Sequence, residues 1–132
     1  MSAACLDSSF LFDLMAEEPI ALEFAAELEG PFLISAVSLY ELLAGETDSG
    51  RIRRVQSLAG EFAVVAAGYE VCSLAALIQT QLLARGRPIP KFDSILAATA
   101  ILAEVPLVAR DRHFAWIPPE FGFRVRTYRM GN

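Results

Sequence analysis

The 132-residue sequence has few of the residues on which several common enzyme classes depend. It has a single histidine, which excludes a metal-free ribonuclease that works with a histidine pair. Its two cysteines lack C-x-x-C spacing, so no Cys/His zinc cluster is available. The G-x-S-x-G motif of serine hydrolases is absent, and so are the G-x-G-x-x-G and G-x-x-x-x-G-K loops that bind nucleotides.

The sequence also lacks a run of about 20 uncharged apolar residues, the length that a membrane-spanning helix needs. Glu70 and Glu104 interrupt its most apolar regions, and its first ten residues lack the basic segment of a secretory signal. Cys5 and Cys72 lie in apolar contexts, as reduced thiols of a protein core do. These features predict a cytoplasmic protein without a membrane partner.

Positive charge is scarce, and the net charge is -5. This balance is unlike that of a nucleic-acid coat protein, which is basic over a whole face, but it suits a nuclease whose acidic site binds cations. Apolar residues make up 55% of the chain and the mean hydropathy is +0.43, which is high for one small domain. We therefore expect apolar surface that a partner covers, and a homodimer.

Short apolar runs alternate with longer segments of helical periodicity, without a repeat or a linker that would divide the chain. Strands separated by helices indicate βαβ units. We expect a single domain over residues 1–132, with a three-layer α/β/α fold and a central, mainly parallel sheet of about five strands. The expected strands are 3–7, 31–35, 62–67, 105–109 and 124–128, and the expected helices are 9–15, 20–29, 37–45, a short one within 46–60, 69–85 and 93–103.

Four acidic residues fall at strand ends or helix starts of this plan. Asp7 follows the first strand, Glu41 lies in the helix after the second, Asp93 opens an alanine-rich helix, and Asp111 follows the fourth strand. In open α/β sheets the ligand crevice lies at the carboxyl ends of the strands, so these side chains can converge. Converging carboxylates raise one another's pKa unless a cation sits between them, and oxygen ligands alone favour Mg²⁺ or Mn²⁺ over Zn²⁺.

Each acid taken alone also has an ordinary structural explanation. Asp7 and Asp93 are well placed to cap helices, and Asp111 suits a turn. Ser38 and Glu41 match the spacing of a capping box. These explanations remain open at the level of the sequence.

The segments that contain the four acids resemble, in order and spacing, the motif series of PIN-domain ribonucleases. The resemblance is strongest to the small VapC-type toxins of toxin–antitoxin modules, and it runs from Leu6 to Ile117. No single motif is specific, but the ordered set is. The segments are CLDSSFLFDLM, ISAVSLYELLAG, IPKFDSILAATAI and LVARDRHFAWI.

By this resemblance, Asp7, Glu41, Asp93 and Asp111 match the acidic metal-binding and catalytic quartet of the family. The implied activity is that of a Mg²⁺-dependent endoribonuclease, with Mn²⁺ as the alternative ion, in which activated water cleaves RNA to leave a 5′-phosphate and a 3′-hydroxyl. Glu41 would complete a second metal position or take the proton of the water. The implied partner is an antitoxin of the VapBC type.

The resemblance has two departures beside these acids. Ser8 or Ser9 falls where the family has a supporting hydroxyl or amide, with Ser9 in place of a frequent asparagine. Ala109 stands where many relatives have threonine. Neither departure removes a metal ligand.

Basic residues beside the acids are candidates for contacts to substrate phosphates. They are Lys91, Arg110 and Arg112, although a solvated charge is an equal interpretation for each. His113 is expected to pack near Phe114 rather than to act in catalysis. The phenylalanines of the first two helices are expected to fill the core or a protein groove.

Two other functions remain open. The first is a PIN-like module that binds protein without catalysis. The second is a phosphoryl-transfer domain in which Asp7, at the end of the first strand, is the nucleophile.

Overall fold

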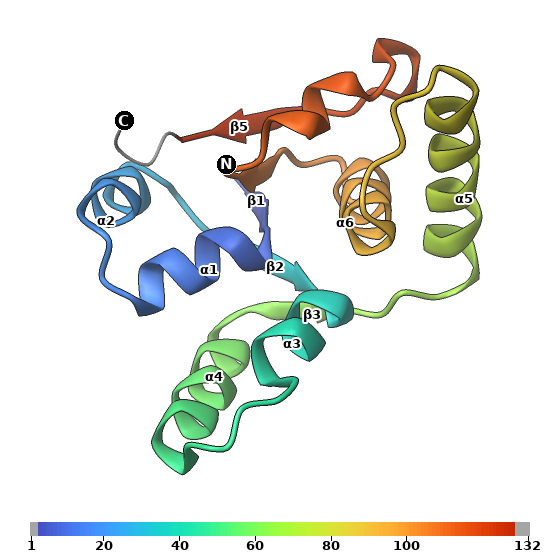
Figure 1. Cartoon of the computed structure of the whole chain (residues 1–132). Helices are drawn as coiled ribbons and strands as arrows, with labels where there is room; N and C mark the ends of the chain where they lie inside the picture. The colour runs from blue at the N-terminus through green and yellow to red at the C-terminus, as the bar shows by residue number, and fades with distance from the viewer. Residues whose placement is uncertain (1–2, 129–132) are drawn as a thin grey trace.

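The structure is a computed structural model, and it describes residues 3–128 of the chain (Figure 1). Within this range the chain alternates short strands with helices, as the sequence predicts. The strands are β1 (Ala4–Leu6), β2 (Phe32–Ser35), β3 (Ala63–Val65), β4 (Leu107–Ala109) and β5 (Val125–Thr127). The helices are α1 (Ser8–Met15), α2 (Pro19–Ala26), α3 (Ala36–Leu43), α4 (Ser49–Glu61), α5 (Tyr69–Ala84) and α6 (Lys91–Leu102), with 3-10 turns η1 (Arg112–Trp116) and η2 (Pro119–Phe121).

The strands form one five-stranded sheet in the order β3-β2-β1-β4-β5. Every neighbouring pair is parallel, which confirms the predicted fold class. The strand order reverses between β1 and β4, where Cys5 pairs with Leu107. In doubly wound sheets such a reversal opens a crevice at the carboxyl ends of the strands.

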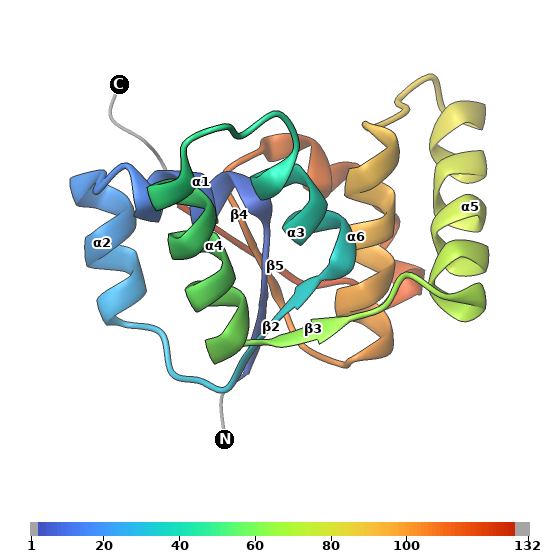
Figure 2. The same ribbon diagram turned by 90° about the horizontal axis from the view of Figure 1, so that it is seen from below.

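Alternate strand residues divide the core into two layers on either side of this sheet. Cys5 and Leu107 are buried in one cluster, which α5 and α6 cover. Leu6 and Val108 are buried in the other, which is covered by α1, α2, α4 and the buried face of α3. Figures 1 and 2 show α5 and α6 on one side of the sheet and α1, α2 and α4 on the other.

Helix α1 is anchored by aromatic packing. Phe10 is 1% exposed, and its ring makes edge contacts with Phe24, at a centroid distance of 6.0 Å, and with Tyr128, at 5.0 Å. Phe12, two residues further along the same helix, is 40% exposed. The expected core role is therefore confirmed for Phe10, whereas Phe12 lies on the surface.

Replacement of Phe10 with alanine should lower the free energy of unfolding by about 3–5 kcal/mol, because it removes the ring and leaves a cavity between α1, α2 and the chain after β5. Phe12→Ala on the same helix is the matched control and should cost about 1 kcal/mol or less. Urea denaturation of the two variants measures both values. Equal losses for the two variants would contradict this packing.

Several predicted boundaries and burials differ from the structure. Helix α6 begins at Lys91 rather than at Asp93, because Pro90 occupies the N-cap position and its fixed φ angle suits a helix entry. Helix α4 is 13 residues long rather than short, and the Asp48 side chain caps it. Helix α2 ends at Ala26 and not at residue 29.

The prediction that both cysteines are core thiols is wrong for one of them. Cys5 is buried in the sheet, but Cys72 is exposed and its thiol donates to the carbonyl oxygen of Ala67. The buried face of α5 is occupied by Val71 and Ala75, and this turns Cys72 outward. No helix in the described part of the chain has the length and apolar character needed to cross a membrane.

Candidate active site

The Asp7 carboxylate lies at the end of the central strand, just before α1. The residue is 2% exposed, and its backbone N–H donates to the carbonyl oxygen of Val108 at 3.0 Å, which ties it to the neighbouring strand. It occupies the N-cap position of α1, but its side chain makes no capping hydrogen bond and instead accepts from the Ser9 hydroxyl. The capping explanation for Asp7 is therefore wrong.

Glu41 reaches the same region from α3. The N-cap of this helix is Ser35, whose hydroxyl oxygen accepts from the backbone N–H of Val37, so the capping box of Ser38 and Glu41 does not form. Glu41 Oε1 instead accepts from the Ser8 hydroxyl at 3.0 Å. The consecutive residues Ser8 and Ser9 thus support two different carboxylates.

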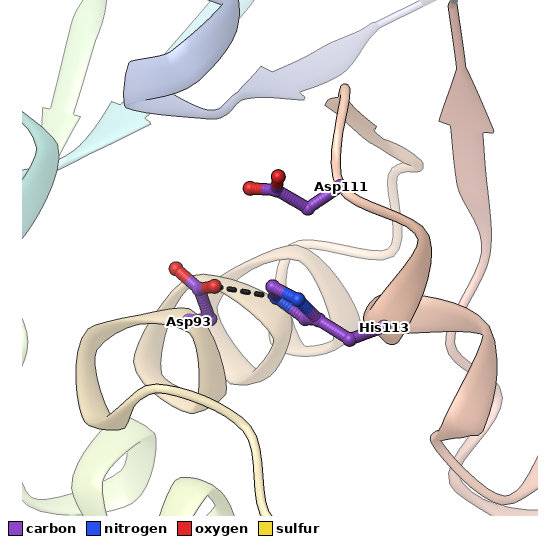
Figure 3. A group of neighbouring side chains, drawn as sticks. All are labelled: Asp93, Asp111 and His113. Carbon is purple, nitrogen blue, oxygen red and sulfur yellow. Dashed lines mark hydrogen bonds and ion pairs between the residues drawn. The ribbon is translucent and has the colours of Figure 1, made fainter.

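Asp93 and Asp111 face each other from opposite segments (Figure 3). Asp93 lies in the first turn of α6, beyond its N-cap, and Asp111 precedes η1 without making a side-chain cap. Ligand atoms of Asp93, Asp111 and His113 lie within 4.8 Å of one another. The His113 ring contacts Asp93, with 2.6 Å between Nε2 and Oδ2.

The electrostatics of Asp7 reflect the other three acids. Burial raises the pKa of its carboxyl from 3.8 to about 6, and the Ser9 hydrogen bond opposes that shift. The charges of Asp93, Asp111 and Glu41 each raise this pKa further. The charges of the other three acids thus act on Asp7, whereas the ligand atoms that lie within 4.8 Å of one another are those of Asp93, Asp111 and His113.

The pKa values of two other acids are raised for similar reasons. For Glu41 the first cause is burial, which the Ser8 hydroxyl opposes and the charge of Asp93 reinforces. For Asp93 the first cause is again burial, which His113 opposes and Asp111 reinforces. The ionised form of each carboxyl is thus disfavoured by burial first and by a neighbouring carboxylate second.

These residues fit a hard divalent cation. Within residues 3–128 the ion pairs include no arginine or lysine on any of the four acids, and only His113 partners one of them. A buried carboxylate with several carboxylate neighbours and no basic partner is stabilised by a cation with oxygen ligands. Mg²⁺ and Mn²⁺ meet that description.

The basic candidates for phosphate contacts occupy different environments. Lys91 is exposed at the start of α6, and Arg112 is exposed at the start of η1. Arg110 is instead ion-paired through Nη1 to both carboxylate oxygens of Asp13, at 3.1 and 3.2 Å, and the Tyr128 hydroxyl donates to Asp13 at 2.8 Å. This network was not predicted from the sequence.

His113 is the residue of this site that the sequence analysis undervalued. Its ring packs near Phe114, at a centroid distance of 4.8 Å, as expected, and at 6.2 Å from Trp116. Its hydrogen bond to Asp93 was not expected. Its place two residues after Asp111, at the same sheet edge, is the sequence feature that could have indicated a role in the site.

Comparison with known proteins identifies the family. The family model of the PIN domain matches residues 4–118, so the chain belongs to the PIN domain family. This confirms the resemblance that the ordered motifs indicated. No curated protein sequence matches the chain significantly.

Solved structures share the fold over nearly the whole chain. A toxin–antitoxin complex from Klebsiella pneumoniae is similar at a TM-score of 0.78 and 21% identity, over 94% of this chain and 96% of that one. DNA-bound VapBC from Salmonella typhimurium is similar at 0.76 and 21%, over 96% and 98%. VapBC-5 from Mycobacterium tuberculosis is similar at 0.70 and 22%, over 98% and 99%.

Proposed function

We propose that this protein is a Mg²⁺-dependent endoribonuclease and the toxin of a VapBC-type pair. The observation that carries the proposal is that the buried Asp7 feels the charges of three other carboxylates, and that none of the four has an arginine or lysine partner among the described residues of this PIN domain. The similarity of fold to toxin–antitoxin complexes supports the toxin assignment. We take residues 1–132 as a single domain.

Asp7, Asp93 and Asp111 would hold the cation. A divalent ion in such a site lowers the pKa of water and offsets the charge that develops on a phosphate during hydrolysis. Glu41, whose pKa is raised by burial, is suited to take a proton from the attacking water. Ser8 and the other residues that hydrogen-bond the acids keep the carboxylates in position.

The proposed partners are an antitoxin and a second copy of the chain. A cavity of about 280 Å³ lies between α1 and α4 and suits an antitoxin segment with both apolar and polar side chains. Its lining residues are Leu14, Met15, Leu58, Ser57, Arg54 and Glu61. The outer side of α5 exposes Leu77 and Leu83, which supports a homodimer. The proposed compartment is the cytoplasm, because the protein would act on RNA there.

Incubation of the purified protein with single-stranded RNA tests the function. We expect cleavage in Mg²⁺ that stops in EDTA, with products that carry a 5′-phosphate and a 3′-hydroxyl by mass spectrometry. Cleavage that persists in EDTA would contradict a metal nuclease. A stable acyl-phosphate on Asp7 would instead support the phosphoryl-transfer alternative, and intact RNA in Mg²⁺ and Mn²⁺ would support the protein-binding one.

The hydrogen bond from His113 to Asp93 predicts a positioning role for the histidine. Replacement of His113 with alanine should lower kcat/KM, or the affinity for Mn²⁺, by about 10–100-fold, because an unsupported carboxylate is held less firmly in the site. His113→Gln can still donate to Asp93 and should recover part of the loss. Calorimetric titration with Mn²⁺ measures the affinity, and wild-type values for both variants would contradict this role.

A further inference from the structure

A second cavity lies beside the acidic site and has the opposite charge. It measures about 240 Å³ and lies between η1 and β5. None of its lining residues is acidic, although the whole chain carries a net charge of -5. The lining residues are Arg110, Arg112, Ala115, Thr127 and Tyr128.

The two arginines flank Asp111 in the chain and share this cavity. Asp111 has extended torsion angles, φ -74° and ψ 136°, and its ligand atoms lie within 4.8 Å of those of Asp93 and His113. Arg110 and Arg112 line the cavity and Asp111 does not, and Asp111 instead faces Asp93 and His113 (Figure 3).

One of these arginines is held in place by buried groups. Asp13 is 8% exposed and binds Nη1 of Arg110 with both carboxylate oxygens, and the Tyr128 hydroxyl supports Asp13. The Arg110 side chain is nevertheless 44% exposed, so the rest of its guanidinium remains accessible. A guanidinium fixed in this way loses little conformational entropy when it binds a ligand.

The second arginine supplies the net positive charge. Asp13 offsets the charge of Arg110, whereas Arg112 is exposed and forms none of the ion pairs within residues 3–128. Thr127 adds a hydroxyl group to the same cavity. Guanidinium groups beside a hydroxyl, without a carboxylate in the lining, suit a phosphate.

We propose that this cavity is a subsite for a backbone phosphate of the RNA strand, next to the phosphate that is cleaved at the acids. The inference rests on the proposed function. Arg110 and Arg112 each lie one residue from Asp111, and adjacent Cα atoms are about 3.8 Å apart, so a strand bound at the acids passes close to the cavity. The strand would lie across the segment from Arg110 to Arg112.

Binding of a fluorescent single-stranded RNA, followed by anisotropy in Mg²⁺, tests the subsite. The parent protein carries Asp7→Asn so that the RNA stays intact. Arg112→Gln in this parent should weaken binding about 5–10-fold for every RNA sequence. It should also reduce the slope of log K against log salt by about 0.7, the value for one phosphate contact to a single strand.

Arg53→Gln, on the exposed side of α4, is the charge-matched control and should bind RNA as the parent does. Arg112→Gln that binds like this control would overturn the subsite and leave the proposed function standing. A parent that binds no RNA, together with wild-type protein that leaves RNA intact in Mg²⁺, would overturn both. An acidic peptide can be added as a competitor. If the peptide binds the parent, does not displace RNA and no longer binds the Arg112→Gln variant, the cavity binds protein and the subsite is overturned.

Discussion

Asp7→Asn should abolish RNA cleavage and at the same time make the metal-free protein more stable. The activity should fall by about 10³-fold or more, which corresponds to about 4 kcal/mol of transition-state stabilisation. The reason is that Asp7 is the most buried of the four acids, follows the central strand β1 at the point where the strand order reverses, and is acted on by the charges of the other three. Asparagine retains the shape of the side chain but removes the charge that the cation needs.

The same substitution should stabilise the protein although it abolishes activity, because an ionised carboxylate at this buried position is unfavourable when no cation is bound. The pKa of Asp7 is raised from 3.8 to about 6, so the folded state binds its proton more tightly than the unfolded state does. The contribution of this proton to the free energy of unfolding is fully present below pH 4 and is lost as pH rises through 6. The unfolding free energy of Asp7→Asn should therefore equal that of wild type near pH 4 and exceed it by about 2–3 kcal/mol above pH 7.

Thermal unfolding in EDTA across this pH range measures the difference. Each kcal/mol corresponds to a few degrees in a domain of this size, so the variant should melt about 6–12 °C higher at pH 7.5. Asp48→Asn, on the exposed N-cap of α4, is the control and should show no such gain. An Asp7 variant that is less stable than wild type at pH 7.5 would mean that the carboxylate is paired in the native state.

Addition of Mn²⁺ should raise the melting temperature of the wild-type protein by about 8–12 °C at a concentration 100-fold above Kd, where linkage gives about 2.7 kcal/mol. The increase should be larger at pH 7.5 than at pH 5, because the cation binds ionised carboxylates. Burial and neighbouring acids raise the pKa of Asp7, Glu41 and Asp93, so protons compete with the cation as pH falls.

Asp93→Asn should lose most of this increase, whereas Asp13→Asn removes a buried acid outside the cluster and should retain it. Asp13 is bonded to Arg110 and Tyr128 and not to the four acids, so the comparison separates loss of a ligand from loss of a buried charge. Differential scanning fluorimetry at both pH values is sufficient. Equal stabilisation of wild type and Asp93→Asn would refute the assignment of Asp93 as a ligand.

The sequence allowed prediction of the fold, and of the place of Asp7 and Asp111 after strands, because both depend on local patterns. Apolar runs of strand length alternate with helical periodicity, and Asp7 and Asp111 directly follow such runs. Helix α4 was underestimated because few of its residues are apolar and Val55 is its one buried residue. The entry to α6 was misplaced because Asp93 is a better cap by residue type than Pro90.

The contacts that the sequence did not reveal join residues far apart in the chain. Arg110 and Asp13 are separated by 97 positions, and Tyr128 and Asp13 by 115. The bond between His113 and Asp93 spans 20 positions and depends on how η1 returns toward α6. Such pairs follow from the packing of the sheet edges, which no local pattern specifies.

The most direct test of the central claim is the anomalous scattering of Mn²⁺ in a crystal of the wild-type protein. We expect a peak among the carboxylates of Asp7, Asp93 and Asp111, and no peak in a crystal of Asp7→Asn grown under the same conditions. No peak among these carboxylates at saturating Mn²⁺, or one bound elsewhere in the molecule, would contradict a metal-dependent nuclease site at this sheet edge.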